Sequence, residues 1–204
     1  MKALLVNGSP RQNGNTSVAL AEVAKTLEAE GIETETYWIG AKPVRGCVAC
    51  GKCRETGRCA FDDDAANALA AKVAGADALV VGSPVHYGQP NGALLALLQR
   101  VCFSASSAVS GKPVATMAVC RRGGATAAFQ CLNMPFQMLN CTIVGSQYWN
   151  IAYGREPGEA ARDAEGMQTM RTLARNLAWL LKSAAARAVP RPAGEPWRPM
   201  HFIR

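Results

Sequence analysis

Short apolar runs alternate along the chain with longer amphipathic runs. The short runs predict strands over 2–6, 32–39, 77–81, 112–119 and 142–149. The longer runs predict helices over 16–30, 62–74, 92–103, 125–139 and 159–186. Polar and apolar residues alternate in the second strand, so we expect it to be less buried than the others. The whole pattern predicts an α/β fold, a parallel sheet with helices on both faces.

One domain accounts for this pattern. No internal repeat or linker divides the sequence, and 204 residues suffice for a single α/β domain with an elaborated loop. We expect that domain to span 1–188, with a Cys-rich loop over 40–61 inserted after the second strand. Residues 189–204 are rich in Pro and Arg and predict a tail without helix.

The net charge of +7 is spread thinly along the sequence. The longest basic run is Arg121-Arg122, so we expect the charge to attract anionic small molecules and not nucleic acid. No segment approaches the roughly 18 apolar residues of a membrane span. The first apolar run is too short for a signal-peptide core, so we expect a cytoplasmic protein with reduced thiols and no membrane partner.

The turn after the first strand is rich in Gly, Ser and Asn and leads directly into a helix. Helix N-termini carry unpaired N–H groups, and hydroxyl and amide side chains add further donors for an anion. The candidate phosphate ligands are Ser9, Arg11, Asn15, Thr16 and Ser17. The turn has no G-x-G-x-x-G pattern, which favours a mononucleotide over a dinucleotide. An ordinary strand-to-helix turn with an Asn or Thr cap is the alternative.

Five segments follow one another in an informative order: GSPRQNGNT, a Cys-rich loop ending in DDD, GSPVHYG, RRGG and GSQYWN. In these segments and their spacing the chain resembles the flavodoxin-like NAD(P)H-dependent FMN reductases and iron–sulfur flavoproteins, over nearly its whole length. The resemblance implies a flavodoxin-like three-layer sandwich whose five parallel strands run in the order 2-1-3-4-5. It also implies FMN as the cofactor.

The loops after the third and fourth strands are expected to meet the phosphate loop. Ligands of such sheets bind at the carboxyl ends of the strands, where the strand order switches. The resemblance assigns to the flavin ring, in the first of these loops, Pro84, Val85, His86, Tyr87 and Gly88. The second loop supplies Arg121, Arg122, Gly123 and Gly124. Their backbone and guanidinium groups suit the pyrimidine side of a flavin. Solvent-facing positions for His86 and the two arginines are the alternative.

Four cysteines stand within a short stretch, at Cys47, Cys50, Cys53 and Cys59. The C-x2-C-x2-C run resembles ferredoxin-type [4Fe–4S] ligation, and the full pattern resembles the compact motif of iron–sulfur flavoproteins. We therefore expect these cysteines to be metal ligands. Nearby Arg and Lys side chains would offset the negative charge, namely Arg45, Lys52, Arg54 and Arg58. A zinc site, a thiol–disulfide relay and four free thiols stay open as alternatives.

The other cysteines lie outside this cluster. Cys102, Cys131 and Cys141 are predicted to be core residues, because free cysteine commonly behaves as a small buried hydrophobe. Cys120 borders the expected flavin site.

The resemblance implies an FMN-dependent oxidoreductase. It would take electrons from NAD(P)H or ferredoxin and pass them to a quinone, a flavin or another small acceptor. No side chain is predicted to be catalytic, because the flavin carries the chemistry. The alternatives are an iron–sulfur flavoprotein carrier without substrate turnover, which the positive charge disfavours, and a redox or metal sensor. The resemblance also implies a homodimer or homotetramer.

Overall fold

The computed structural model describes residues 1–186, 189–196, 198 and 200. Its elements, in chain order, are β1 (Lys2–Asn7), α1 (Asn15–Ala29), β2 (Glu33–Trp38), α2 (Cys53–Thr56), α3 (Ala66–Ala74), β3 (Ala78–His86), β4 (Gln89–Pro90), α4 (Gly92–Ser104), α5 (Ser106–Val109), β5 (Pro113–Cys120), α6 (Ala125–Met138), β6 (Thr142–Ile143), β7 (Ile151–Tyr153), the 3-10 helix η1 (Glu159–Arg162) and α7 (Ala164–Ala185).

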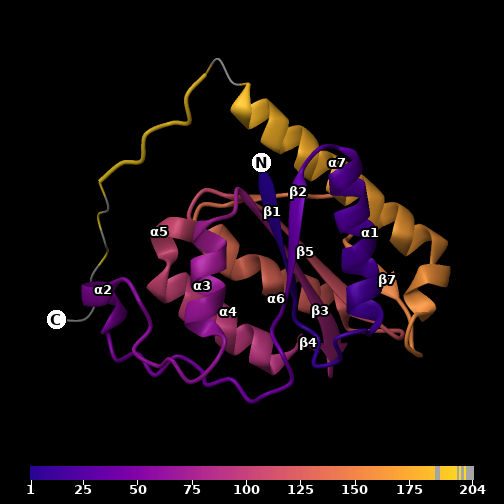
Figure 1. The fold of residues 1–204 in the computed structure, drawn as a ribbon, viewed down its shortest axis with the longest axis horizontal. Coiled ribbons are helices and arrows are strands. Elements are labelled where there is room, and N and C mark those ends of the chain that lie inside the picture. The colour runs from indigo at the N-terminus through magenta and orange to yellow at the C-terminus, as the bar shows by residue number, and fades with distance from the viewer. Residues whose placement is uncertain (187–188, 197, 199, 201–204) are drawn as a thin grey trace.

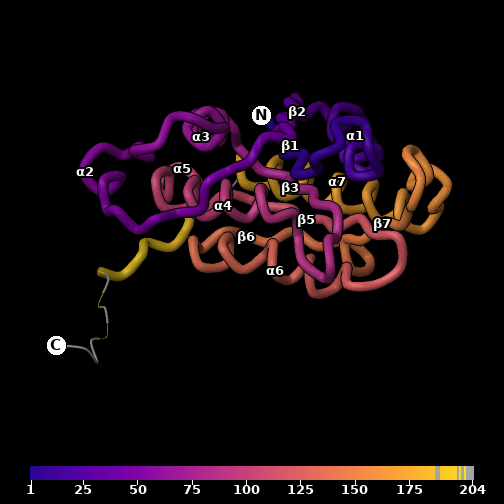
Figure 2. Tube along the Cα trace, turned by 90° about the horizontal axis from the view of Figure 1, so that it is seen from below, coloured from indigo at the N-terminus to yellow at the C-terminus, as the bar shows by residue number. Residues whose placement is uncertain are grey.

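The strands form one sheet in the order β2-β1-β3-β5-β6, and each neighbouring pair in this order is parallel (Figure 2). β7 also pairs with β5 in parallel, and β4 folds back antiparallel on β3. The predicted strand order 2-1-3-4-5 is confirmed. The structure describes seven strands where five were predicted, because β4 and β7 were not predicted, and the strand predicted over 142–149 is shortened to β6.

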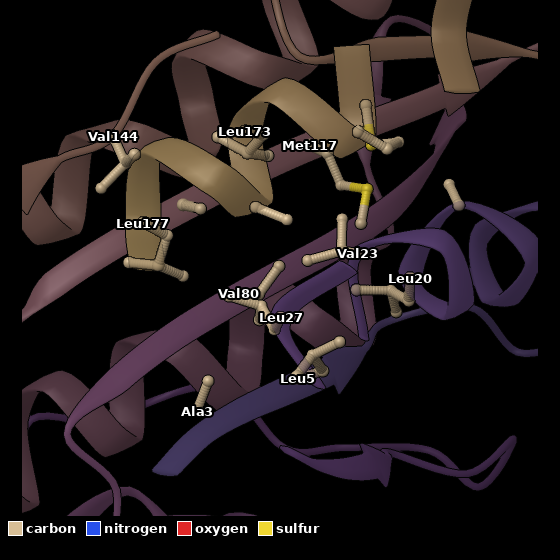
Figure 3. Packing of buried hydrophobic residues seen from close by; sticks show 14 of the residues in the cluster. Ala3, Leu5, Leu20, Val23, Leu27, Val80, Met117, Val144, Leu173 and Leu177 are labelled. Atoms are coloured by element: carbon tan, nitrogen blue, oxygen red, sulfur yellow. The ribbon is translucent and has the colours of Figure 1, made fainter. Parts of the chain in front are cut away.

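Helices cover both faces of the sheet, with α1 and α7 on one side and α3, α4 and α5 on the other (Figure 1). Successive residues of a strand point to opposite faces. Leu5 of β1 accordingly packs with Leu20 and Leu173 in the cluster under α1 and α7 (Figure 3), whereas Leu4 belongs to the cluster on the opposite face. Burial on both faces explains why β1 reads as a continuous apolar run.

The strand predicted over 142–149 ends at Ile143, and a separate strand, β7, begins just after the buried side chain of Asn150. Asn150 Nδ2 donates to the carbonyl oxygens of Thr116 at 2.9 Å and Val144 at 3.3 Å, and its Oδ1 accepts from the Ser146 hydroxyl at 2.8 Å. In the segment between β6 and β7, the Asn150 side-chain amide thus bonds to β5 where a continuous strand would use its backbone. The chain can therefore turn aside between these short strands without leaving the Thr116 carbonyl unpaired.

Two predicted helix starts are also wrong, for a common reason. The helix predicted from residue 62 begins at Ala66, because the Asp64 carboxylate accepts the Ala66 amide proton at 3.0 Å. The final α-helix begins at Ala164, where Asp163 accepts from the Gly166 amide at 2.9 Å. In both places an aspartate bonds to a nearby backbone amide and marks the boundary.

The described tail residues, 189–196, 198 and 200, form neither helix nor strand. Arg191 lies against the domain, and its guanidinium donates to the carbonyl oxygens of Gly111 and Asn140, each at 2.7 Å. The rest of the predicted tail lies outside the described residues. Among the helices that the structure describes, none combines the length and apolar character needed to cross a bilayer.

Asn150→Ala should lower the free energy of unfolding by about 2–4 kcal/mol, because it leaves two carbonyl groups and a hydroxyl without their buried partner. Urea denaturation measures this change. The matched control is Asn176→Ala, which removes an exposed amide that donates to Gly145 O at 2.8 Å and should cost less than about 1 kcal/mol. Equal losses in the two variants would contradict the role given to Asn150.

Candidate functional site

The loop after β1 leaves the sheet in close contact with β3. The Gly8 amide donates to the Gly82 carbonyl oxygen at 2.8 Å. A Cβ atom on Gly8 would lie 2.8 Å from that oxygen and 2.4 Å from Leu94 Cδ2. Gly8 is therefore the residue that lets the first loop start beside the third strand.

Side chains fix the shape of this loop from within. The Asn7 amide donates to Gln12 O at 3.1 Å, and its oxygen accepts from the Ser9 amide at 3.1 Å. The Ser9 hydroxyl accepts from the Arg11 amide at 3.1 Å, and Trp38 Nε1 donates to Ser9 O at 2.8 Å. The Ser9 hydroxyl proton remains available for a ligand, because that oxygen is used here only as an acceptor.

The loop ends at the N-terminus of α1. Within the described residues, no side chain caps this terminus, and its first turn holds no acidic residue. The positive end of the helix dipole and the first backbone N–H groups therefore face a place where an anion is favoured. Thr16 is buried at this end.

A further segment, residues 154–160, packs against the end of the loop after β1, at Asn15. Asn15 Nδ2 donates to Glu156 O at 2.9 Å, and Asn15 Oδ1 accepts from the Ala160 amide at 3.0 Å. A Cβ on Gly154 would lie 2.7 Å from the Ala160 nitrogen and 2.8 Å from Asn15 Cγ. The Asn15 side chain, predicted to be a phosphate ligand, thus already joins two loops.

On the other side of the site, β3 and the loop after β5 meet. Residues 82–86 continue β3 instead of forming the predicted loop, and a two-residue turn of Tyr87 and Gly88, with φ of 50° and 79°, leads into β4. Gly124 has φ of 81°, and a Cβ there would lie 2.8 Å from Gly88 Cα. Because these backbones touch, the hairpin and the loop after β5 form one wall.

These segments enclose a cavity of about 310 Å³ at the carboxyl ends of β1, β3 and β5. Eight predicted ligands line it: Ser9, Arg11, Asn15, Thr16, Pro84, Val85, His86 and Arg121. Six predicted ligands are not among its lining residues: Ser17, Tyr87, Gly88, Arg122, Gly123 and Gly124. Cys120, expected to border the site, also lines it, and sequence reasoning missed six further lining residues: Pro10, Gly14, Val119, Gly154, Arg155 and Pro157.

The differences have local causes. The Ser17 amide donates to Gly14 O at 3.0 Å inside the first turn of α1, and the Tyr87 side chain is fully exposed at the hairpin tip. Of the missed residues, Gly154 and Pro157 stand just after a strand, and this spacing is the signal that could have revealed a further loop at the same sheet edge.

The four clustered cysteines line a second cavity, of about 170 Å³. Two of the thiols accept N–H bonds: Cys47 Sγ from the Ala49 amide at 3.5 Å, and Cys59 Sγ from Arg100 Nε at 3.2 Å. Within the residues that the structure describes, no three His, Cys, Asp or Glu side chains are close enough together to hold a metal ion. The thiols therefore share a cavity without converging on one point.

Arg100 was not among the predicted site residues. It lies in the apolar helix α4, and its side chain is 1% exposed and pairs with the Asp64 carboxylate. Burial alone would raise the pKa of Asp64, but bonds from the Ala66 amide and Arg100 hold it below its ordinary value. The sequence signal for this contact was a single charged residue within a largely apolar helix.

The cations that were predicted to neutralise the thiols mostly have other partners. Arg45 pairs with Asp63 at 3.2 Å, Lys52 pairs with Glu55 at 2.8 Å, and Arg58 pairs with Asp62. Arg54 lines the cysteine cavity beside Arg100. The basic residues nearest the cavity are thus one predicted and one unpredicted arginine.

Of the four cysteines outside the cluster, Cys120 is buried, whereas the prediction of core positions for Cys102, Cys131 and Cys141 is wrong, because all three are only half-buried. Burial raises the pKa of Cys102 to about 12, and it also raises the pKa of Cys120 and Cys141. A buried, protonated thiol is a poor nucleophile and a poor metal ligand. Cys120 is buried at the edge of the cavity between β1, β3 and β5.

Known structures define the class of this fold. RosB with bound 8-demethyl-8-formylriboflavin-5'-phosphate matches with a TM-score of 0.71 at 16% identity, over 100% of this chain and 96% of that one. A flavodoxin from the domain Archaea matches with a TM-score of 0.59 at 15% identity, over 89% of this chain and 99% of that one. The predicted flavodoxin-like fold is confirmed.

Sequence comparison defines the family. The model of the NADPH-dependent FMN reductase family matches residues 1–156, and the chain belongs to this family. An iron–sulfur flavoprotein of Methanocaldococcus jannaschii is 30% identical over 192 residues, which cover 89% of this chain and 98% of that protein. Family and relatives together support a flavin-dependent oxidoreductase or electron carrier.

Proposed function

We propose that the chain binds FMN in the cavity between β1, β3 and β5, and that it is an oxidoreductase which receives electrons from NAD(P)H or ferredoxin. The observation that carries this proposal is the meeting of an uncapped helix N-terminus with two further strand-end loops around one cavity. The N-terminus of α1 suits a phosphate, and the two loops at the ends of β3 and β5 suit a flat ring.

Different residues around the cavity would bind different parts of FMN. The Ser9 and Thr16 hydroxyls and the first amides of α1 would hold the phosphate, with Arg11 as counter-charge. The backbone of Pro84, Val85 and His86 would follow the edge of the ring. Arg121 would stabilise negative charge on the ring.

Bound FMN supplies the redox chemistry, since a flavin accepts a hydride and can release its electrons singly or in pairs. The protein binds and orients the ring, and it leaves one face open for the donor and then for the acceptor. The acceptor is proposed to be a quinone, a flavin or another small oxidant.

The cysteine cavity is proposed to hold a [4Fe–4S] cluster through Cys47, Cys50, Cys53 and Cys59. The donor set fits, because four thiols surround one cavity and two of them already accept N–H bonds. A cluster would carry single electrons between the flavin and a protein partner such as ferredoxin. Binding would require the thiols to approach one another across the cavity.

The two cavities share no lining residue, and Figures 1 and 2 place α2 and β7 at opposite ends of the molecule. Within one chain the cysteine site is therefore remote from the loop that follows β7 at the flavin site. This separation supports the proposal of a homodimer or homotetramer, in which a second chain could bring its cysteine site to the flavin.

Replacing Ser9 by Ala together with Thr16 by Val should weaken FMN binding about a hundredfold or more, because each hydrogen bond to a charged group contributes about 1.5–3 kcal/mol. Titration followed by flavin fluorescence measures the affinity. Ser17→Ala is the control, since Ser17 lies outside the cavity lining. Affinities equal to that of the control would place the phosphate elsewhere.

The FMN-loaded protein should oxidise NAD(P)H through many turnovers when a quinone is supplied in excess. The reason is that one open flavin face can serve donor and acceptor in succession. Absorbance at the nicotinamide band follows the reaction. A single stoichiometric reduction, obtained only with ferredoxin, would instead support the carrier without substrate turnover.

Protein purified anaerobically should contain about four irons and four sulfides per chain, and Cys59→Ser should lose most of both. Metal and sulfide analysis measures this. Cys131→Ser is the control, because Cys131 lies on α6, outside the cysteine cavity. Fewer than about two irons per chain in fresh wild-type protein would contradict the cluster.

A further inference from the structure

The C-terminal half of α4 forms one wall of the cysteine cavity, through Arg100, Phe103 and Ser104. Arg100 and Ser104 are four residues apart and therefore lie on the same face of the helix. Both are buried, although polar side chains are seldom buried without partners.

Arg100 joins the two ends of the cysteine loop. Its Nη1 donates to the Arg45 carbonyl oxygen at 3.3 Å, just before the first cysteine. Beyond the last cysteine, Nη2 donates to the Phe61 carbonyl oxygen at 2.9 Å, and Nη1 donates to the Asp64 carboxylate. One guanidinium thus closes the segment from residue 45 to residue 64.

The same guanidinium reaches the sulfur of the last cysteine. Arg100 Nε lies 3.2 Å from Cys59 Sγ, so its N–H points at an atom expected to ligate the cluster. Only arginine offers donors in a rigid planar fork that can serve two carbonyls, a carboxylate and a sulfur at once. Lysine would keep the charge but lose this geometry.

Ser104 supplies a second donor on the same wall. The residue is 7% exposed, and within the described part of the chain its Oγ has no hydrogen-bond partner. A buried hydroxyl without a hydrogen-bond partner lowers the stability of the fold. A polar or anionic ligand atom that accepts its proton would therefore bind favourably at this position.

We propose that Arg100 is a positioning residue of the cysteine site: it holds Cys59 in place by closing the loop, and its Nε–H···S bond raises the reduction potential of the iron–sulfur centre. Ser104 adds a second hydrogen bond to a sulfur of that centre. The effect on the potential rests on the proposed function. Hydrogen bonds to sulfur and nearby positive charge favour the more negative, reduced state of a cluster.

The loop closure can be tested without a cluster. In metal-free, reduced protein, Arg100→Lys and Arg100→Gln should speed hydrogen exchange across residues 45–64 about tenfold or more. Arg171→Lys, which alters an arginine of α7 that pairs with Glu22 of α1, should leave the exchange of that segment unchanged. Unchanged exchange in both Arg100 variants would overturn the closure.

The midpoint reduction potential of the holoprotein distinguishes a direct effect of Arg100 on the iron–sulfur centre from a general loosening of the loop. In reconstituted holoprotein, Arg100→Lys and Ser104→Ala should each shift the midpoint potential to more negative values in a titration followed by electron paramagnetic resonance. Asp64→Asn also loosens the loop, but it keeps the Nε–H···S bond and removes a negative charge, so its shift should be zero or positive. A negative shift in Asp64→Asn matching that of Arg100→Lys, or no shift in Arg100→Lys, would overturn the role in tuning.

The two proposals fail in distinguishable ways. If the wild-type chain assembles no iron–sulfur centre, the cluster assignment is wrong, and the effect on the potential is wrong with it. The closure of residues 45–64 by Arg100 is still decided by the exchange measurement on metal-free protein.

Discussion

The hydrogen bond from the Gly8 amide to the Gly82 carbonyl oxygen, 2.8 Å long, fixes where the loop after β1 leaves the carboxyl edge of the sheet. It joins the start of the loop after β1 to β3, where the strand order reverses between β1 and β3. At such a point the following connections diverge to opposite faces and leave a crevice. The missing Cβ of Gly8 is what allows the approach, and Asn15 and Gly124 then bring in the loops after β7 and β5.

The cysteine site obeys a different constraint, because it lies in a loop with only the short helix α2 between β2 and α3. Such a segment needs tertiary contacts to hold four thiols near one another. Arg100 supplies them from a rigid helix. A buried guanidinium is tolerated only when it is fully paired, so the loop and the arginine depend on each other.

The sequence predicted those features that depend on neighbouring residues, namely the periodicity of strands and helices and the composition of turns. The apolar run of β1 predicted that strand, and the turn after it supplied four of the predicted residues that line the cavity. The strand order came from the resemblance to the family. Contacts between distant residues could not be predicted from the sequence. No residue near Asn150 indicates that its amide bonds to the Thr116 carbonyl in β5. Arg100 and Asp64 are likewise 36 residues apart and meet only in the folded chain. The exposure of Tyr87 at the hairpin tip was also not visible in the sequence, because it follows from the two-residue turn that leads into β4.

A crystal structure of the FMN-loaded protein tests the central assignment most directly. The phosphate should lie within hydrogen-bond distance of the Thr16 amide and the Ser9 hydroxyl, and the ring should lie between Pro84–His86 and Arg121. A flavin bound with its phosphate away from the N-terminus of α1, for example in the cysteine cavity, would contradict the assignment.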